Sequence, residues 1–228
     1  MSKYILMDIE GTTTSISFVH DVLFPYTRKH LAEFINNNIT DKCVIECLND
    51  TKETVRLEES RDIDTTEAVK TLLHWINIDR KHPALKTLQG LVWKDGYSNS
   101  NFTAHIYDDV IPCIQKWHDS GKVLAIYSSG SVEAQKLLFK HTCFGDLTKY
   151  ISHYFDLQTG RKQEPDSYRR ITDRLSAESS DILFLSDSAD ELNAAISAGL
   201  RTTQLIRKGT HPCTNHRNAK DFTEVEID

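Results

Sequence analysis

The chain has 228 residues, of which 39% are hydrophobic and 26% charged, and its formal net charge is -6 at pH 7. This composition is typical of a folded protein and argues against a disordered chain. The acidic balance gives no general attraction for nucleic acid or for an anionic membrane, so we expect neither as a partner. An anionic substrate needs positive charge concentrated at one site.

The first residues, MSKYILMDIEG, contain only a short apolar run before the first acids. That run is too short for a signal-peptide core, and no stretch reaches the roughly 18 to 20 apolar residues of a membrane helix. The five cysteines form no CxxC pair, which is typical of reduced thiols. We expect a cytoplasmic protein, with the nucleus as a further compartment, and a self-contained acidic chain compatible with a monomer.

The first predicted element is a buried strand over residues 4–7, an apolar run without alternation. Asp8, Glu10 and Gly11 follow it, and Gly11 permits a turn whose amides can point at an anion. Asp8 is suited to attack phosphorus and form an aspartyl-phosphate. Glu10 is suited to protonate the leaving oxygen and later to activate water. The alternative is an acidic loop start that only caps a helix.

Residues 16–103 have a different character, with apolar side chains at helical spacing and no strong strand alternation. We predict a helical cap, inserted after the first strand. Residues 94–103 are polar and turn-rich, and they predict the linker that returns to the sheet. The expected organisation is therefore an α/β core of residues 1–15 and 104–228, with residues 16–103 as the cap.

A second strand is predicted over residues 123–127, with Ser128, Ser129 and Gly130 before a helix over residues 131–141. Hydroxyls and backbone N–H groups at a helix N-terminus donate to a phosphate, and the helix dipole adds attraction. We expect Ser128 and Ser129 to bind the phosphate of a substrate. The alternative is simple helix capping.

Lys162 precedes a helix that is predicted to begin near Pro165. A lysine at this point can reach the nucleophile and offset the repulsion between a carboxylate and a phosphate dianion. Charge alone does not distinguish it from the neighbouring Arg161. The alternative is an ordinary surface lysine.

A third strand is predicted over residues 182–185, before Asp187 and Glu191. Mg²⁺ prefers oxygen ligands and keeps several waters. The carboxylates of Asp8 and Asp187, with a backbone carbonyl near Glu10, would make a site for one Mg²⁺ ion, with Glu191 as an outer partner. The alternative is an acid pair favoured by the helix dipole.

Strands that alternate with helices predict an open parallel sheet with helices on both faces. In such sheets ligands bind beyond the carboxyl ends of the strands, so the residues that follow the three strands are expected at one edge. The sequence contains no GxGxxG, Walker or GxSxG motif, and thus gives no support for a nucleotide cofactor or for serine hydrolysis.

Together these residues resemble the haloacid dehalogenase superfamily, whose four motifs fall in this order, and most closely its enolase-phosphatase (acireductone synthase) branch. The resemblance spans nearly the whole chain, except residues 40–66. The stretches that carry it are DIEGTTT from Asp8, FVHDVLFPY from Phe18, LKTLQGLVW from Leu85, YSSGSVEAQKLLF from Tyr127, GRKQEPDSY from Gly160 and LFLSD from Leu183.

The resemblance implies a three-layer α/β/α, Rossmann-like parallel sheet with an inserted helical cap. It implies the substrate 2,3-diketo-5-methylthiopentyl-1-phosphate, which the family enolises and then dephosphorylates to acireductone in methionine salvage, with the cap supplying the methylthio pocket. It also implies functional residues. These are Asp8, Glu10 and Asp187 for Mg²⁺, and Ser128, Ser129 and Lys162 for the substrate.

The chain departs from the family pattern at one place, and the sequence leaves two other functions open. After Arg207 the family usually continues Pro-Gly-Asn, whereas this chain continues Lys-Gly-Thr-His over residues 208–211.

A phosphatase acting on another small phosphoester is the first alternative, and a non-catalytic scaffold for partner binding is the second. The joint presence of the acids and Lys162 speaks against a scaffold. Dehalogenation is disfavoured because that chemistry has no use for Glu10.

Overall fold

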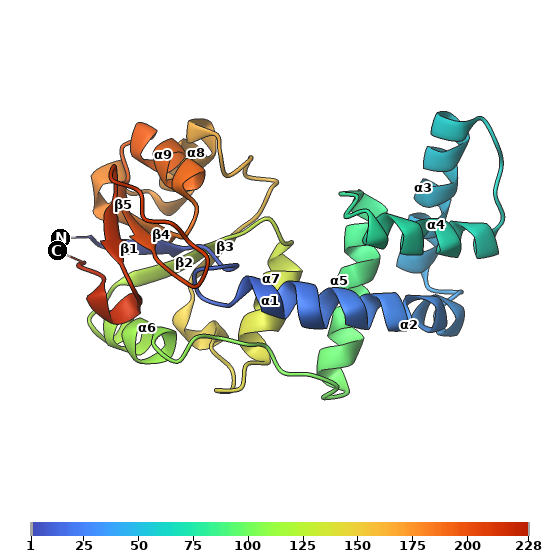
Figure 1. Cartoon of the computed structure of the whole chain (residues 1–228), viewed down its shortest axis with the longest axis horizontal. Coiled ribbons are helices and arrows are strands. Elements are labelled where there is room, and N and C mark those ends of the chain that lie inside the picture. The colour runs from blue at the N-terminus through green and yellow to red at the C-terminus, as the bar shows by residue number, and fades with distance from the viewer. Residues whose placement is uncertain (1, 228) are drawn as a thin grey trace. The chain divides into compact units, whose positions relative to one another are not determined.

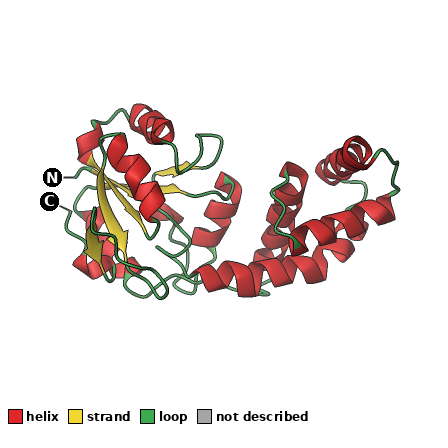
Figure 2. Ribbon diagram, turned by 45° about the horizontal axis from the view of Figure 1, so that its top comes forward, coloured by secondary structure: helices red, strands yellow, loops and turns green. Residues whose placement is uncertain are grey.

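The computed structural model describes residues 2–227, which divide into two compact units. Residues 1–18 and 103–228 form the first, here called the sheet unit, and residues 19–102 form the second, the helical unit. Every strand of the described residues lies in the sheet unit (Figures 1 and 2). Within the same described part of the chain, no helix is long and apolar enough to cross a membrane.

The sheet unit is built on six parallel strands in the order β3-β2-β1-β4-β5-β6. β1 lies at the centre and pairs with β2 on one side and β4 on the other. The three apolar runs that the sequence predicts as strands are β1, β2 and β4. These three strands are covered on both faces. The strands are β1 (Tyr4–Met7), β2 (Val123–Tyr127), β3 (His153–Phe155), β4 (Ile182–Ser186), β5 (Arg201–Leu205) and β6 (Arg217–Ala219).

Helices cover both faces of the sheet, so the predicted three-layer α/β/α architecture is confirmed. Helices α8 and α9 lie on one side, and α6 and α7 on the other (Figure 1). Right-handed crossovers require helices on both faces, because the chain runs outward from β1 to β3 and then returns to β4. The helices of this unit are α1 (Ile16–Phe18), α6 (Val110–Asp119), α7 (Val132–Lys140), α8 (Pro165–Leu175) and α9 (Ala189–Ser197).

The strand order reverses between β1 and β4, which is where doubly wound sheets bind ligands, beyond the carboxyl ends of the strands. Asp8 follows β1 and Asp187 follows β4, so both stand at this switch point. Their neighbourhood rests on a rigid aromatic core. Tyr168 of α8 packs edge-on against Tyr127 at a centroid distance of 5.6 Å and lies 5.2 Å from the ring of Phe184.

The helical unit has its own apolar core. Side chains predicted from helical spacing, including Leu31, Leu72 and Leu88, are completely buried there. The elements are a π-helical turn η1 (Val19–Leu23), α2 (Phe24–Asn37), α3 (Lys42–Glu59), α4 (Thr65–Asn77) and α5 (Pro83–Ser98).

The linker predicted over residues 94–103 is partly wrong, because α5 continues to Ser98. Gly96 lies inside this helix and is buried. A side chain there would collide with the rings of Phe102 and Tyr26. The glycine that looked like a turn signal is therefore a close-packing position.

We predict that Leu72→Ala lowers the free energy of unfolding by about 2–5 kcal/mol, since Leu72 is 0% exposed and its loss leaves a cavity. Leu57→Ala is the matched control, because Leu57 on α3 is 73% exposed and should change stability by less than about 0.5 kcal/mol. Chemical denaturation measures both values. Equal effects would contradict the assigned core.

Candidate active site

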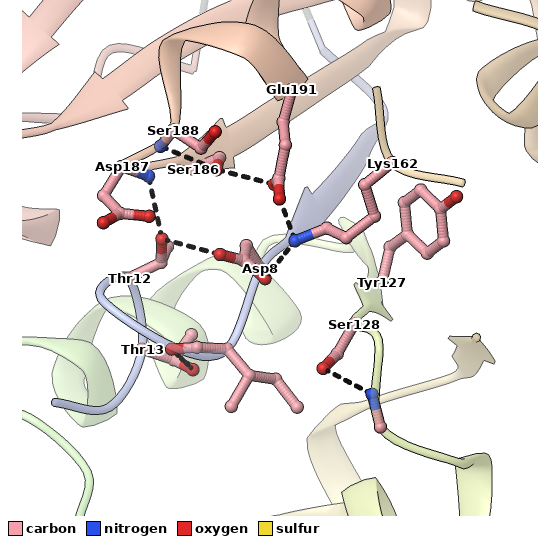
Figure 3. Close-up of polar contacts among 12 residues, drawn as sticks. Asp8, Thr12, Thr13, Tyr127, Ser128, Lys162, Ser186, Asp187, Ser188 and Glu191 are labelled. Atoms are coloured by element: carbon pink, nitrogen blue, oxygen red, sulfur yellow. Dashed lines mark hydrogen bonds and ion pairs between the residues drawn. The ribbon is translucent and has the colours of Figure 1, made fainter. Parts of the chain in front are cut away.

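One threonine at the switch point links the carboxylate of Asp8 to the backbone of Asp187. The Thr12 hydroxyl lies 3.4 Å from Asp8 Oδ2 as donor and accepts the backbone N–H of Asp187 at 3.0 Å (Figure 3). Asp8 is only 5% exposed, and its own N–H donates to the carbonyl of Leu185 on β4. The first and fourth strands thus hold the two acids in fixed register.

The turn after Asp8 is closed by its own backbone. The N–H groups of Thr12, Thr13 and Thr14 all point at the carbonyl of Ile9, at 2.9–3.2 Å. Gly11 has a φ of +75°, and a Cβ at this position would collide with the Asp187 carboxylate. The predicted glycine turn is therefore present, and its glycine makes room for the second acid.

Lys162 reaches into the site from the loop before α8. Its Nζ lies 2.5 Å from Asp8 Oδ1 and 2.6 Å from Glu191 Oε2, and the residue is only 4% exposed. Burial alone would lower the pKa of Lys162, but the charges of Asp8 and Glu191 outweigh it and hold that pKa above its ordinary value. Lys162 is therefore a buried cation, whereas the neighbouring Arg161 is exposed.

Two tyrosines fix the loop that carries this lysine. Tyr168 donates its hydroxyl to the carbonyl of Lys162 at 2.7 Å, and Tyr127 donates to the carbonyl of Gly160 at 2.9 Å. The ammonium also lies 5.9 Å from the centre of the Tyr127 ring. The aromatic core of the sheet unit thereby determines where the buried charge stands.

Glu191 binds Lys162 directly, which the sequence did not predict. Its Oε2 also accepts the hydroxyl of Ser186 at 2.9 Å. Burial, and next the charge of Asp8, raise the pKa of Glu191 to about 7. Glu191 thus forms an ion pair with the lysine (Figure 3), and its expected role as an outer partner of a metal stays a prediction.

The acids at the switch point repel one another. Burial, followed by the charge of Asp8, raises the pKa of Asp187 to about 6, and the charge of the exposed Glu10 adds to this shift. Residues 2–227 contain no group of three or more His, Cys, Asp or Glu side chains placed to hold a metal ion. The carboxylates of Asp8 and Asp187 are hard oxygen donors of the kind that suits Mg²⁺.

The predicted phosphate-binding serines follow β2. Ser128 is 5% exposed, its N–H donates to the carbonyl of Phe155 at 3.1 Å, and its hydroxyl accepts the N–H of Gly130 at 3.2 Å. Ser129 is exposed. Gln135 was not singled out from the sequence, yet its buried amide donates to the carbonyls of Gly130 and Phe155 at 2.8 Å each. This amide shapes the serine loop.

Comparisons with known proteins show which family the chain belongs to. The family model of haloacid dehalogenase-like hydrolases matches residues 3–199. Enolase-phosphatase E1 of Thioalkalivibrio sulfidiphilus is 46% identical over 228 residues, covering 100% of both chains. Enolase-phosphatase E1 of Marinobacter nauticus is 48% identical over 227 residues, covering 99% of this chain and 97% of the other.

Solved structures share the fold over the whole length. The crystal structure of the Unknown transcript 4 protein of Saccharomyces cerevisiae has a TM-score of 0.82 and 34% identity, covering 99% of this chain and 100% of that chain. CbbY from Rhodobacter sphaeroides in complex with phosphate has a TM-score of 0.61 at 17% identity, covering 98% and 96%, and is similar in fold alone. The chain therefore belongs to the haloacid dehalogenase-like hydrolases and, among them, to the enolase-phosphatase E1 family.

Proposed function

We propose that the chain is a bifunctional enolase-phosphatase that converts 2,3-diketo-5-methylthiopentyl-1-phosphate to acireductone and phosphate in methionine salvage. The observation that carries the phosphatase step is the buried ion pair between Asp8 and Lys162 at the switch point of the sheet. The full-length relatives named enolase-phosphatase E1 support the choice of substrate.

In the proposed phosphoryl transfer, a carboxylate oxygen of Asp8 attacks phosphorus and the bond to the substrate oxygen breaks. Glu10 gives its proton to that leaving oxygen and then takes a proton from the water that hydrolyses the aspartyl-phosphate. Hydrolysis restores Asp8 and releases phosphate. Lys162 offsets the negative charge that the phosphoryl group brings to the carboxylate. Ser128 and Ser129 bind the phosphoryl oxygens from the end of β2.

The side chains of Asp8 and Asp187, with a backbone carbonyl near Glu10, would hold one Mg²⁺ ion. When bound, the ion supplies positive charge that neutralises phosphoryl oxygens. The raised pKa of Asp187 supports this assignment, because crowded carboxylates gain most from a cation.

The remaining parts of the assignment are carried by the family alone. They are the enolisation step, and the role of residues 16–103 as a cap that supplies the methylthio pocket. A cytoplasmic location and a monomeric state stay predictions, and residues 2–227 contain no helix able to span a membrane. A phosphatase for another small phosphoester predicts phosphate release from many substrates without an enediol. A non-catalytic scaffold predicts no phosphate release from any substrate.

We predict that Asp8→Asn loses at least about 1,000-fold in phosphate release, because the amide oxygen is a poor nucleophile. Phosphate release and the ultraviolet absorbance of the enediol should be followed together on the diketo phosphate, with and without Mg²⁺. Asp190→Asn is the matched control, since Asp190 is an exposed acid on α9. Normal turnover by the Asp8 variant would refute the assignment of the nucleophile.

A second prediction concerns Glu10, which is one methylene longer than the aspartate of most superfamily phosphatases. We suggest that this length lets one carboxylate serve both proton transfers. Glu10→Asp should therefore slow formation of the enediol by about tenfold or more, within the range of general acid–base catalysis. Enolisation at the wild-type rate would sink this idea.

A third prediction concerns the room that Gly11 leaves for Asp187. Gly11→Ala should raise the Mg²⁺ concentration needed for half-maximal activity, because the added methyl group displaces the Asp187 carboxylate. Gly121→Ala is the control for backbone strain, since Gly121 has a φ of +81° but open space where an added Cβ would lie. Equal Mg²⁺ dependence in the two variants would contradict the metal assignment.

A further inference from the structure

Arg207 follows β5, which ends at Leu205. Its Nη1 and Nη2 atoms bind the two carboxylate oxygens of Asp109 at 2.9 and 2.7 Å, a bidentate pair just before α6. The Arg207 side chain is 9% exposed and that of Asp109 is 18% exposed. This pair is buried far more than an ordinary surface ion pair.

Another edge of the same guanidinium binds the turn that follows Asp8. Its Nε and Nη2 atoms donate to the backbone carbonyl of Thr12 at 3.3 and 3.1 Å. Two aromatic rings pack against the guanidinium, whose carbon lies 4.0 Å from the centre of the Tyr107 ring and 5.7 Å from that of Phe222. Asp109 is fixed as well, because its Oδ2 accepts the N–H of Phe222 at 2.9 Å.

The carbonyl that Arg207 binds belongs to the residue that links the two acids of the site. The hydroxyl of Thr12 lies between Asp8 and the backbone of Asp187. The next carbonyl, that of Thr13, accepts the N–H of Tyr107 at 3.1 Å. Arg207 and the segment before α6 thus bind the backbone carbonyls of the turn, while the Thr12 hydroxyl contacts the carboxylate of Asp8 and the backbone of Asp187.

We propose that Arg207 is a positioning residue for phosphoryl transfer, which holds Asp8 in attack geometry by fixing the Thr12 peptide. The inference rests on the proposed function, in which Asp8 is the nucleophile. Only a planar group with several donors can bind a carboxylate along one edge and a carbonyl along another. A lysine at this position would keep the charge but not this geometry.

The test compares Arg207→Met with Arg217→Met, both in the full chain. Arg217 is the matched control, because it is paired with Glu226 at the surface, with 62% of its side chain exposed. We expect Arg207→Met to lower kcat about 10- to 100-fold, the loss typical of a slightly misplaced reacting group. KM should stay within about threefold, because phosphate binding at the end of β2 is untouched. Arg217→Met should keep kcat and KM at their wild-type values.

A double-mutant cycle with Thr12→Val separates positioning from general stabilisation of the fold. If Arg207 acts through Thr12, the double variant should lose little more kcat than Thr12→Val alone. If the two losses in kcat multiply in the double variant, the inference is overturned. An unchanged kcat in Arg207→Met would overturn it as well. If Arg207→Met does not fold, as judged by circular dichroism, Arg207→Lys takes its place in the cycle, because it keeps a cation beside Asp109.

Failure of the proposed function has a different signature. It would appear as absent turnover in the wild-type chain, or as turnover retained by Asp8→Asn. An active wild type, an inactive Asp8 variant and a fully active Arg207→Met would refute the role of Arg207 alone.

Discussion

A buried ammonium group between two carboxylates is the interaction on which this site depends. Burying Lys162 is unfavourable unless its charge is matched, and Asp8 and Glu191 match it at 2.5 and 2.6 Å. Removing one member of such a pair typically costs about 3–5 kcal/mol, because an uncompensated charge is left inside. The lysine therefore constrains the Asp8 carboxylate and, in the proposed mechanism, lowers the electrostatic repulsion of a phosphate dianion. Tyr127 and Tyr168 transmit the rigidity of the sheet to the loop that carries it.

The sequence predicted the centre of the fold better than its periphery. The three central strands are apolar throughout because both faces are covered, and such runs are recognisable. The outer strands are not: β3 has three residues, and β5 is polar because Gln204 binds the carbonyls of Asp187 and His211 with its side-chain amide. Helix α3 was predicted only as part of the helical region of residues 16–103, because its buried face includes Cys47 and Thr51 beside Val44 and the apolar pattern is therefore weak.

The same limit applies to the site. Residues at strand ends could be predicted together, because the parallel sheet places all of those ends at one edge. The choice between Arg161 and Lys162 depends on which side chain the loop turns inward, and that is decided by tyrosines distant in sequence. The ion pair between Glu191 and Lys162 was not predicted, for the same reason. The proposed role of Arg207 could not be predicted from the sequence, because its partners Asp109 and Thr12 lie far from it along the chain.

The most direct test of the mechanism is to look for the phosphoryl group on the protein. A single turnover of the diketo phosphate should be stopped with acid within milliseconds, and the digested chain examined by mass spectrometry. If Asp8 held by Lys162 is the nucleophile, the peptide that contains Asp8 carries a transient phosphoryl group that disappears as phosphate is released. Turnover in which phosphate appears without phosphorylation of that peptide at any quench time would contradict the mechanism.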